Sequence, residues 1–333
     1  MARARLDAAL DEGLALPGGE ALALRPAPGT DLDALGRDRT TIVHSFRPHR
    51  DAWARQGWRV ADEAPEAAVA WVSVPRSKAL ARALVAQAAA RAPLVLVDGQ
   101  RADGVDALWR EVRALRPGTE GVTLGHGRLF WFSGGPGFEP WASRGPERGA
   151  DGLFHQPGVF SEAGADPASL LLARALPAKL PRRMGDLGAG VGVLSLAVLA
   201  REGVASLDLV EAEGLALDCA RLNVVDERAR FLWADALEAP LGPWDGCVVN
   251  PPFHRGREAD PGLGAAFVAA AARALAPGGQ LWLVANRGLP YEAALAEAFR
   301  EAEALGAEGG FKILHARHPR RPGEARRPVV RRR

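Results

Sequence analysis

The stretch Met-Gly-Asp-Leu-Gly-Ala-Gly-Val-Gly at residues 184–192 joins an apolar strand to an apolar helix expected over Val193–Leu199. A strand, a glycine turn and a helix in this order are typical of an α/β fold with a parallel sheet. The backbone can pass close to a ligand at Gly188, Gly190 and Gly192, and the helix N-terminus favours polar or negative groups. A dinucleotide fingerprint needs a further glycine where this helix begins with valine. The turn therefore predicts a nucleoside-bearing ligand without a pyrophosphate.

Acidic side chains follow the next two expected strands. A strand over Ser206–Val210 leads into Glu211, about 20 residues after the turn, the distance at which an acid accepts hydrogen bonds from ribose hydroxyls. A strand over Arg230–Trp233 ends near Asp235, which is placed to accept from an adenine amino group. Taken alone, Glu211 also fits a solvated acid at a helix start, and Asp235 also fits an ordinary turn residue.

A short apolar strand, Cys247–Val249, leads into Asn-Pro-Pro-Phe. Asn250 is then expected at the C-terminal tip of a strand, where open α/β sheets bind ligands. Each proline fixes φ at about −65° and donates no N–H, so the Asn250 side-chain oxygen and the Pro251 carbonyl can face one N–H₂ group. Phe253 offers a flat face for stacking a base, worth roughly 1–3 kcal/mol. Asn-Pro-Pro alone fits a plain turn, but the glycine turn, the two acids and this corner in that order are far more specific.

Together these segments resemble the class I S-adenosylmethionine-dependent methyltransferases, and more narrowly the bacterial ribosomal-RNA guanine-N2 methyltransferases of the small-subunit type. The resemblance runs from about Pro157 to His318, just under half of the chain. The matching segments are Pro157-Gly-Val-Phe-Ser161, Asn250-Pro-Pro-Phe-His-Arg-Gly256, Val284-Ala-Asn286 with Leu289-Pro-Tyr291, and Gly310-Phe-Lys312. The relative that modifies the large subunit shares most of them, so the choice of subunit stays open.

The resemblance implies S-adenosylmethionine as cofactor and a guanine of ribosomal RNA, or of a ribosomal subunit, as substrate. The residues expected at the cofactor are Asp186, Gly188, Ala189, Gly190, Gly192, Glu211, Asp235 and Asn250. The catalytic residues are expected to be Asn250, Pro251 and Phe253. The two acceptors would hold the hydrogens of the N2 amine, turn its lone pair toward the methyl carbon and stabilise the charge that develops on nitrogen.

The residues expected at the substrate are Phe160, Phe253, His254 and Lys312. The target base must leave its stack to reach the pocket. His254 is a better candidate for shaping the loop or contacting phosphate than for acting as the catalytic base. Phe160 and Lys312 fit packing and surface roles equally well.

The predicted fold class is α/β, with two methyltransferase-like, Rossmann-type domains that each carry helices on both faces of a mostly parallel sheet. We expect an N-terminal domain over residues 1–135, a linker rich in turn formers over 136–152, a catalytic domain over 153–318 and a basic tail over 319–333. In the catalytic domain we expect a helix over Leu263–Leu275 that ends at Pro277-Gly278-Gly279, and two closing strands that pair antiparallel.

The N-terminal half repeats the rhythm found after Asn250: strand, proline, helix, strand, helix, strand. Val74-Pro75-Arg76 is expected where Asn-Pro-Pro would be. This half lacks the glycine turn, so we expect it to bind no cofactor. The resemblance implies the same, because that family carries a degenerate N-terminal copy with a role in folding or RNA docking. An unrelated α/β domain is the alternative.

Composition excludes several other classes. Cys219 and Cys247 lack metal-type spacing and fit small buried hydrophobic residues, so we expect neither a metal nor a disulfide. The sequence has no apolar run of the ~18 residues that a membrane span needs and no signal-peptide core, so we expect a cytoplasmic protein. We also expect a monomer. Residues 317–333 hold eight arginines and one glutamate, a composition that fits RNA contact or a solvated tail.

Three other functions stay open on the sequence alone. Asn-Pro-Pro-Phe suits any planar N–H₂ group, so adenine N6, cytosine N4 or a protein glutamine are alternative acceptors, although phenylalanine after the prolines favours a nucleobase. A non-catalytic RNA-binding protein is a second alternative, which the intact glycine turn, acids and Asn250 argue against. A nicotinamide oxidoreductase is the third, and valine at position 193 disfavours it.

Overall fold

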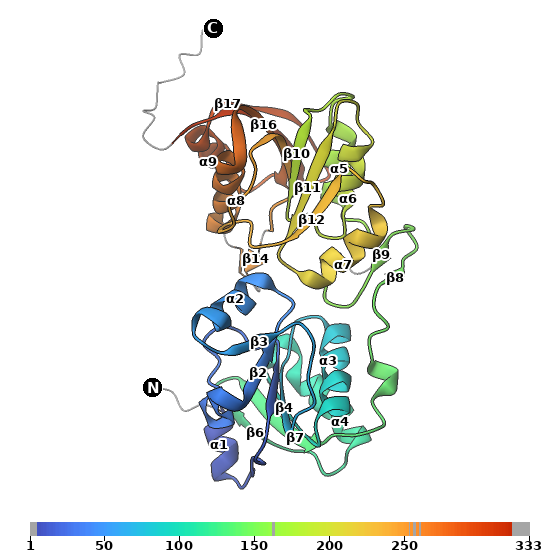
Figure 1. The fold of residues 1–333 in the computed structure, drawn as a ribbon, viewed down its shortest axis with the longest axis vertical. Coiled ribbons are helices and arrows are strands. Elements are labelled where there is room, and N and C mark those ends of the chain that lie inside the picture. Colours follow the sequence, from blue (N-terminus) through green and yellow to red (C-terminus); the bar gives the residue numbers. More distant parts are fainter. Residues whose placement is uncertain (1–4, 162–163, 253, 256–257, 260, 322–333) are drawn as a thin grey trace. The chain divides into compact units, whose positions relative to one another are not determined.

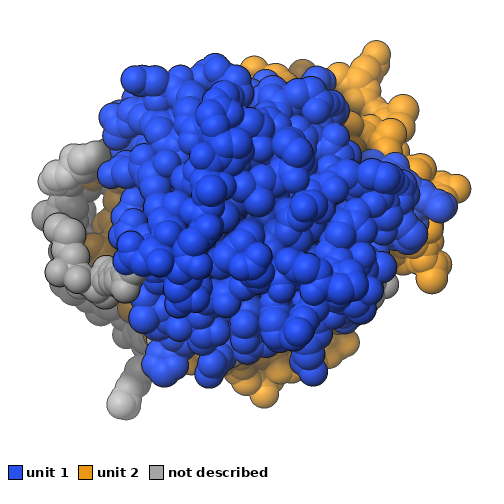
Figure 2. Space-filling view, turned by 90° about the horizontal axis from the view of Figure 1, so that it is seen from below, with its two compact units in different colours: residues 1–147, 156–162 blue, residues 148–155, 163–333 orange. Residues whose placement is uncertain are grey.

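The computed structural model describes residues 5–161, 164–252, 254–255, 258–259 and 261–321. The chain forms two compact units, one of residues 1–147 and 156–162 and the other of residues 148–155 and 163–333 (Figure 2). The chain therefore first passes from the first unit to the second after residue 147, inside the expected linker, and residues 156–162 belong again to the first unit. The domain limits expected at residues 135, 152 and 318 stay predictions.

A seven-stranded sheet in the order β3-β2-β1-β4-β5-β7-β6 forms the centre of the first unit (Figure 1). Its strands are parallel except for β7, which pairs antiparallel with β5 and β6. The strands are β1 (Ala21–Leu24), β2 (Thr40–Val43), β3 (Arg59–Ala61), β4 (Val69–Ser73), β5 (Leu94–Gln100), β6 (Glu120–Leu124) and β7 (Gly127–Ser133). The α-helices are α1 (Arg5–Asp11), α2 (Arg47–Arg55), α3 (Lys78–Arg91) and α4 (Val105–Leu115), and the 3₁₀ turns are η1 (Asp33–Leu35), η2 (Arg37–Arg39), η3 (Arg101–Asp103) and η4 (Glu139–Trp141).

The second unit is built on a sheet in the matching order β12-β11-β10-β13-β16-β18-β17. Its strands are β10 (Arg183–Leu187), β11 (Ser206–Glu211), β12 (Ala229–Trp233), β13 (Trp244–Val249), β16 (Leu275–Asn286), β17 (Phe299–Glu308) and β18 (Phe311–Pro319). Two short strand pairs are β8 (Glu147–Arg148) with β9 (Phe154–His155) and β14 (His254–Arg255) with β15 (Glu258–Ala259). The helices are α5 (Pro167–Ala175), α6 (Val193–Leu199), α7 (Gly214–Asn223), α8 (Pro261–Ala274) and α9 (Tyr291–Ala298).

The sheet of the second unit is buried on both faces, because its side chains alternate between two hydrophobic clusters. In β13, Cys247 and Val249 belong to the cluster that includes α8 and α9, whereas Val248 belongs to the cluster that includes α5 and α6. All three are fully buried. Full burial of a side chain of this size contributes about 1.5–3 kcal/mol. Helices therefore cover both faces of the sheet (Figure 1), and the predicted fold class is confirmed.

Several predicted elements are confirmed, and one boundary is wrong. Helix α6 has the predicted limits, and β18 pairs antiparallel with β16 and β17 as expected. Helix α8, however, ends at Ala274, and Pro277-Gly278-Gly279 lie within β16 rather than ending a helix. The reason is tertiary, because Leu275 pairs with Trp244 of the neighbouring β13 and so starts the strand before the turn formers are reached.

The two sheets can be compared strand by strand through their registers. Leu24 of β1 pairs with Val43 and Val72, just as Leu187 of β10 pairs with Val210 and Val249. The residues that directly follow these paired positions therefore correspond: Arg25 to Gly188, His44 to Glu211 and Ser73 to Asn250. The expected alignment of Val74-Pro75-Arg76 with Asn-Pro-Pro is wrong by one residue, and the first unit has Ser73-Val74-Pro75 there.

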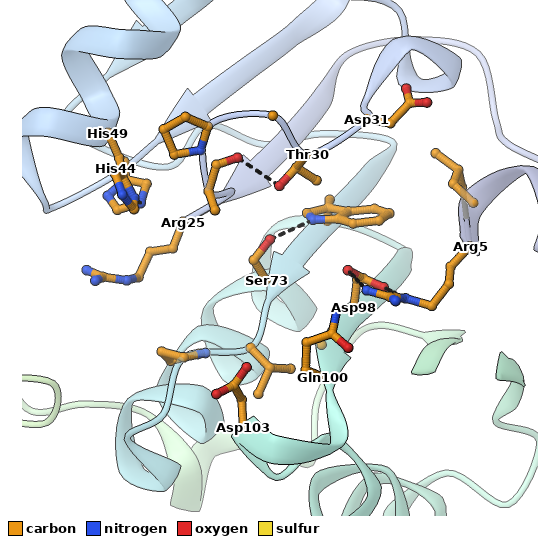
Figure 3. Close-up of a pocket in the computed structure, with 18 of the residues that line it drawn as sticks. Arg5, Arg25, Thr30, Asp31, His44, His49, Ser73, Asp98, Gln100 and Asp103 are labelled. Atoms are coloured by element: carbon orange, nitrogen blue, oxygen red, sulfur yellow. Dashed lines mark hydrogen bonds and ion pairs between the residues drawn. The ribbon is translucent and has the colours of Figure 1, made fainter. Parts of the chain in front are cut away.

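A pocket of about 800 Å³ lies at these strand ends in the first unit. Figure 3 shows Arg25, His44 and His49 on one side of it and the ion pair of Arg5 with Asp98 on the other. The pKa of His44 is lowered to about 2, because the ring is buried and faces Arg25 and His49. The pocket thus has an arginine and a neutral histidine where the second unit has a glycine and an acid. That this unit binds no cofactor stays a prediction.

Candidate active site

The glycine turn of the second unit has the backbone that its sequence predicts. Gly188, Gly190 and Gly192 have φ of 74°, 56° and 95°, a region that favours glycine. A Cβ atom at Gly192 would lie 2.8 Å from Cγ2 of Val224. The N–H groups of Gly188 and Ala189 donate to the Val210 carbonyl at 2.9 and 3.1 Å, which ties the turn to β11.

Asp186 lies beneath the turn, at 0% exposure in β10. Its Oδ2 accepts the Ser195 hydroxyl at 2.6 Å, while its Oδ1 is buried and has no hydrogen-bond partner among the described residues. The pKa of Asp186 is raised to about 7, chiefly because burial disfavours the charged form and also because Glu211 is near. A positively charged ligand would favour the ionised carboxylate.

Glu211 ends β11 beside the turn, as the sequence predicts. Its Oε2 accepts from the Gly190 N–H and its Oε1 from the Glu213 N–H, both at 2.8 Å. Burial raises the pKa of Glu211. Asp235 follows β12, where its Oδ1 accepts from the Leu237 N–H at 2.8 Å. The structure therefore brings Asp186, the glycines and Glu211 together, and it shows Asp235 in a turn whose contacts fit either of its expected roles.

Asn250 follows the last residue of β13, at the tip of a central strand. Its Nδ2 donates to Oδ2 of Asp166 at 2.8 Å and to Oγ of Ser169 at 2.9 Å. Its Oδ1 is buried and has no partner among the described residues. A buried acceptor without a donor costs about 1–3 kcal/mol, so such a group calls for a ligand or another explanation.

The residues after Asn250 are described in part. Pro251 is buried and Pro252 is exposed. Phe253, a predicted catalytic and substrate residue, lies outside the described residues. His254 begins β14, which pairs antiparallel with β15, and its side chain also lies outside the described part.

The two other predicted substrate residues, Phe160 and Lys312, have surroundings that leave their expected role untested. Phe160 is 63% exposed and belongs to the first unit, so its expected place at the substrate stays a prediction. Lys312 donates through Nζ to the Leu289 carbonyl at 2.7 Å and to Glu292 at 2.6 Å. Because these contacts tie Lys312 to the start of α9, its expected place at the substrate stays a prediction.

Three residues of the site were missed by sequence reasoning. Asp166 and Ser169, at the start of α5, hold the amide of Asn250. Asn223 donates to the Val191 carbonyl at 2.9 Å and to the Phe154 carbonyl at 3.1 Å, which joins the glycine turn to β9. Asp-Pro-Ala-Ser at 166–169 carries a helix-start signal that could have located the cap, but nothing in the sequence indicates its contact with Asn250.

The described part of the chain shows neither a metal-binding cluster nor a helix that could span a membrane. Within the described part of the chain, no group of histidine, cysteine and acidic residues is arranged to hold a metal ion. No helix among the described residues combines the length and apolar character that crossing a membrane requires.

Comparison with known proteins agrees with this geometry. The family profile described as Methyltransferase small domain matches residues 152–315. Ribosomal RNA large subunit methyltransferase G of Aeromonas salmonicida is 32% identical over 53% of this chain and 49% of its own length. Ribosomal RNA small subunit methyltransferase C of Pseudomonas aeruginosa is 30% identical over 74% of this chain and 80% of its own. The chain spans about half the length of several curated relatives that it matches.

Among solved structures, the 16S rRNA N2-guanine methyltransferase of T. thermophilus, in complex with AdoMet and guanosine, superimposes with a TM-score of 0.77. The match covers 95% of this chain and 93% of that one, at 27% sequence identity. It therefore extends over both units rather than over the second alone. The chain belongs to the family of ribosomal RNA small subunit methyltransferase C, and it carries the methyltransferase small domain in its C-terminal half.

Proposed function

We propose that the protein transfers a methyl group from S-adenosylmethionine to the exocyclic N2 of a guanine in ribosomal RNA of the small subunit. The observation that carries the proposal is the buried Oδ1 of Asn250, an acceptor at the tip of a central strand that has no partner among the described residues. An N–H₂ group of a base is a donor that fits this acceptor. The T. thermophilus relative, solved with AdoMet and guanosine, supports the same ligands.

The residues around the glycine turn fit S-adenosylmethionine. The turn lacks bulky side chains at Gly188 and Gly190, and the buried Oδ1 of Asp186 has no hydrogen-bond partner among the described residues. Asp186 and Glu211 both have raised pKa values, and a cationic ligand beside them would lower both. Asp186, the turn and Glu211 would hold the cofactor, and Asp235 is proposed to accept from its adenine.

The bound cofactor would supply an electrophilic methyl group on a sulfonium. Asn250 and the Pro251 carbonyl would accept the two N2 hydrogens and so orient the lone pair of an otherwise poor nucleophile. These acceptors would also stabilise the positive charge that develops on nitrogen, a contribution of the kind that fixed dipoles make in other active sites. The methylated amine loses a proton readily, so no strong base is needed. Phe253 is proposed to stack on the base, and His254, Phe160 and Lys312 to contact the RNA.

The large-subunit RNA is the second candidate substrate, because ribosomal RNA large subunit methyltransferase G is also a close match. The extent of similarity favours the small subunit. The small-subunit relative of P. aeruginosa aligns over 80% of its length, and the T. thermophilus structure matches both units.

The test is methyl transfer from labelled S-adenosylmethionine to 16S rRNA, 23S rRNA, 30S subunits and 50S subunits, followed by mass spectrometry of the nucleosides. We expect N2-methylguanosine in one small-subunit substrate. Methylation of the large-subunit substrates instead would show that the large subunit is the substrate. Formation of N6-methyladenosine would show that the acceptor is adenine N6 and not guanine N2.

The Asn250→Ala variant tests the acceptor itself. We expect kcat to fall about 10²–10³-fold, as when a catalytic dipole is removed, while the Kd for S-adenosylmethionine stays within a factor of about 3. Gln56→Ala is the control, because it removes the same carboxamide from an exposed position in the first unit. Equal turnover by the wild type and Asn250→Ala would rule out this mechanism.

A further inference from the structure

The side-chain amide of asparagine has two ends of nearly the same shape and opposite hydrogen-bonding character. If the Asn250 oxygen faces the base, it accepts an amine hydrogen; if the amide is turned over, its N–H₂ faces the donor hydrogens of the base and repels them. The proposed chemistry at Asn250 therefore depends on which end of the amide points to the substrate. Rotation of this amide must be restrained by its other contacts.

The contacts in the structure permit one orientation. Both acceptors of the Nδ2 hydrogens come from the first residues of α5: Oδ2 of Asp166 at 2.8 Å and Oγ of Ser169 at 2.9 Å. An ionised carboxylate has no hydrogen to donate, so Asp166 can face the N–H₂ end of Asn250 and cannot face its oxygen. The two acceptors use both hydrogens of Nδ2, and Oδ1 is left on the opposite edge of the amide without a partner among the described residues.

Asp166 is itself held by the start of the helix. It is the N-cap of α5, where its Oδ2 also accepts the Ser169 N–H at 2.9 Å, and Pro167 occupies the first turn. The helix is anchored in the core, because Ala168 and Leu172 are fully buried in the cluster beneath the sheet. A fixed helix end thus supports a side chain that lies 84 positions later in the sequence.

We propose that Asp166 and Ser169 are positioning residues that keep the Asn250 oxygen turned toward the N2 amine of the substrate. The proposal rests on the proposed guanine-N2 methyl transfer and adds residues that nothing in the catalytic motif indicates. Mutation of a residue that orients a metal ligand through a hydrogen bond typically costs about 10- to 100-fold in affinity or activity, and we expect a loss of the same order for a residue that orients Asn250. Asp166 acts through Asn250 and need not touch the substrate.

The variant Asp166→Asn separates positioning from helix capping. Asparagine caps a helix about as well as aspartate, so α5 keeps its N-cap. Its own amide, however, can donate to a reversed Asn250, so both orientations become possible. We expect kcat to fall about 10- to 100-fold, with the KM for S-adenosylmethionine and the melting temperature unchanged. Ser169→Ala, which removes one of the two acceptors, is expected to lower kcat by a smaller factor.

Two control variants accompany Asp166→Asn. Asp218→Asn makes the same charge change at an exposed position of α7, where the side chain is paired with Arg221. Ser77→Ala removes the cap of α3, whose Oγ accepts the Leu80 N–H at 3.1 Å in the first unit. Both are expected to retain the wild-type kcat.

A double-mutant cycle with Asn250→Ala gives the deciding readout. If Asp166 acts through Asn250, then Asp166→Asn lowers kcat in the wild type and causes no further loss in Asn250→Ala. The same four proteins are also compared by their Kd for guanosine in the presence of S-adenosylhomocysteine. This binding measurement does not require the Asn250→Ala variant to be active. Equal losses in both backgrounds, or a wild-type kcat for Asp166→Asn, would overturn the proposal. A wild type that makes no N2-methylguanosine would instead overturn the proposed function.

Discussion

At the scale of single residues, two acids lie beside the glycine turn of the second unit, one buried (Asp186) and one part-buried (Glu211). Asp186 lies in the strand before the turn, and Glu211 ends the neighbouring strand and accepts from Gly190. Burial raises the pKa of both carboxyl groups. Acids whose ionisation is opposed by their surroundings gain most from a cationic ligand, so we expect binding of the proposed cofactor to depend on pH.

The affinity for S-adenosylmethionine is expected to rise with pH between 5.5 and 7.5. The pKa of Asp186 is about 7 without ligand, so below that value its carboxyl is largely protonated and must lose a proton to bind a cation. Each unit of pH below the pKa should weaken binding by up to about tenfold, since one pKa unit corresponds to 1.36 kcal/mol. Calorimetric titration across this range measures the slope.

Asp186→Asn should flatten this pH dependence, because the amide does not ionise. The exposed Asp218→Asn variant should keep it. A slope that is the same in the wild type and in Asp186→Asn would show that another group, such as Glu211, is responsible.

At the scale of secondary-structure elements, the glycine turn determines how α6 begins. Gly192 is the N-cap of α6 and has a φ of 95°. A Cβ atom at this position would come too close to the side chain of Val224. The backbone of residues with side chains avoids this conformation at a cost of about 1–2 kcal/mol. The turn is therefore constrained twice, by its dihedral angle and by its packing against the end of α7.

Gly192→Ala is expected to lower the free energy of unfolding of the second unit by about 1–3 kcal/mol through this strain and the contact with Val224. It should also weaken S-adenosylmethionine binding, because the turn must shift. Gly118→Ala is the control: apart from Gly118 and its chain neighbours, no atom of the described residues lies within 4 Å of its Cβ position, and its φ is not in the left-handed region. Urea denaturation of both variants, followed by fluorescence, measures the difference. If Gly118→Ala lowered the free energy of unfolding as much as Gly192→Ala, backbone strain and the contact with Val224 would not explain the effect.

At the scale of the whole molecule, two sheets of the same strand order carry different residues at corresponding strand ends. The glycine, acid and asparagine of the second unit correspond to Arg25, His44 and Ser73 in the first. Arg25 would bring a cation and a long side chain to the position of Gly188, and the neutral ring of His44 would stand in place of a carboxylate. These substitutions oppose a cationic sulfonium ligand.

Titration of the full chain with S-adenosylmethionine should therefore give one site per chain. Variants of the first unit such as His44→Ala should leave the stoichiometry and Kd unchanged, whereas Asp186→Asn should weaken the one site. Two sites of comparable affinity would contradict the prediction that the first unit binds no cofactor.

Much of the second unit could be predicted from the sequence, because its signals are local. A glycine turn between an apolar strand and an apolar helix requires specific dihedral angles, so Gly188, Gly190 and Gly192 indicated the fold and the place of the proposed cofactor site. Glu211 and Asn250 could be placed at strand ends because parallel strands with crossover helices bring those ends to one edge. The end of α8 was predicted wrongly, because pairing of Leu275 with Trp244 outweighs the local turn signal.

By itself the sequence determined the α/β class, the order of strand, turn and acid, and the position of the asparagine, since these depend on backbone preferences and apolar periodicity within a few residues. The tertiary structure alone decided that Ser73 matches Asn250 and that Asp166 and Ser169 hold the Asn250 amide. Strand register and contacts between residues 84 positions apart arise from packing of whole elements, and no local pattern encodes them.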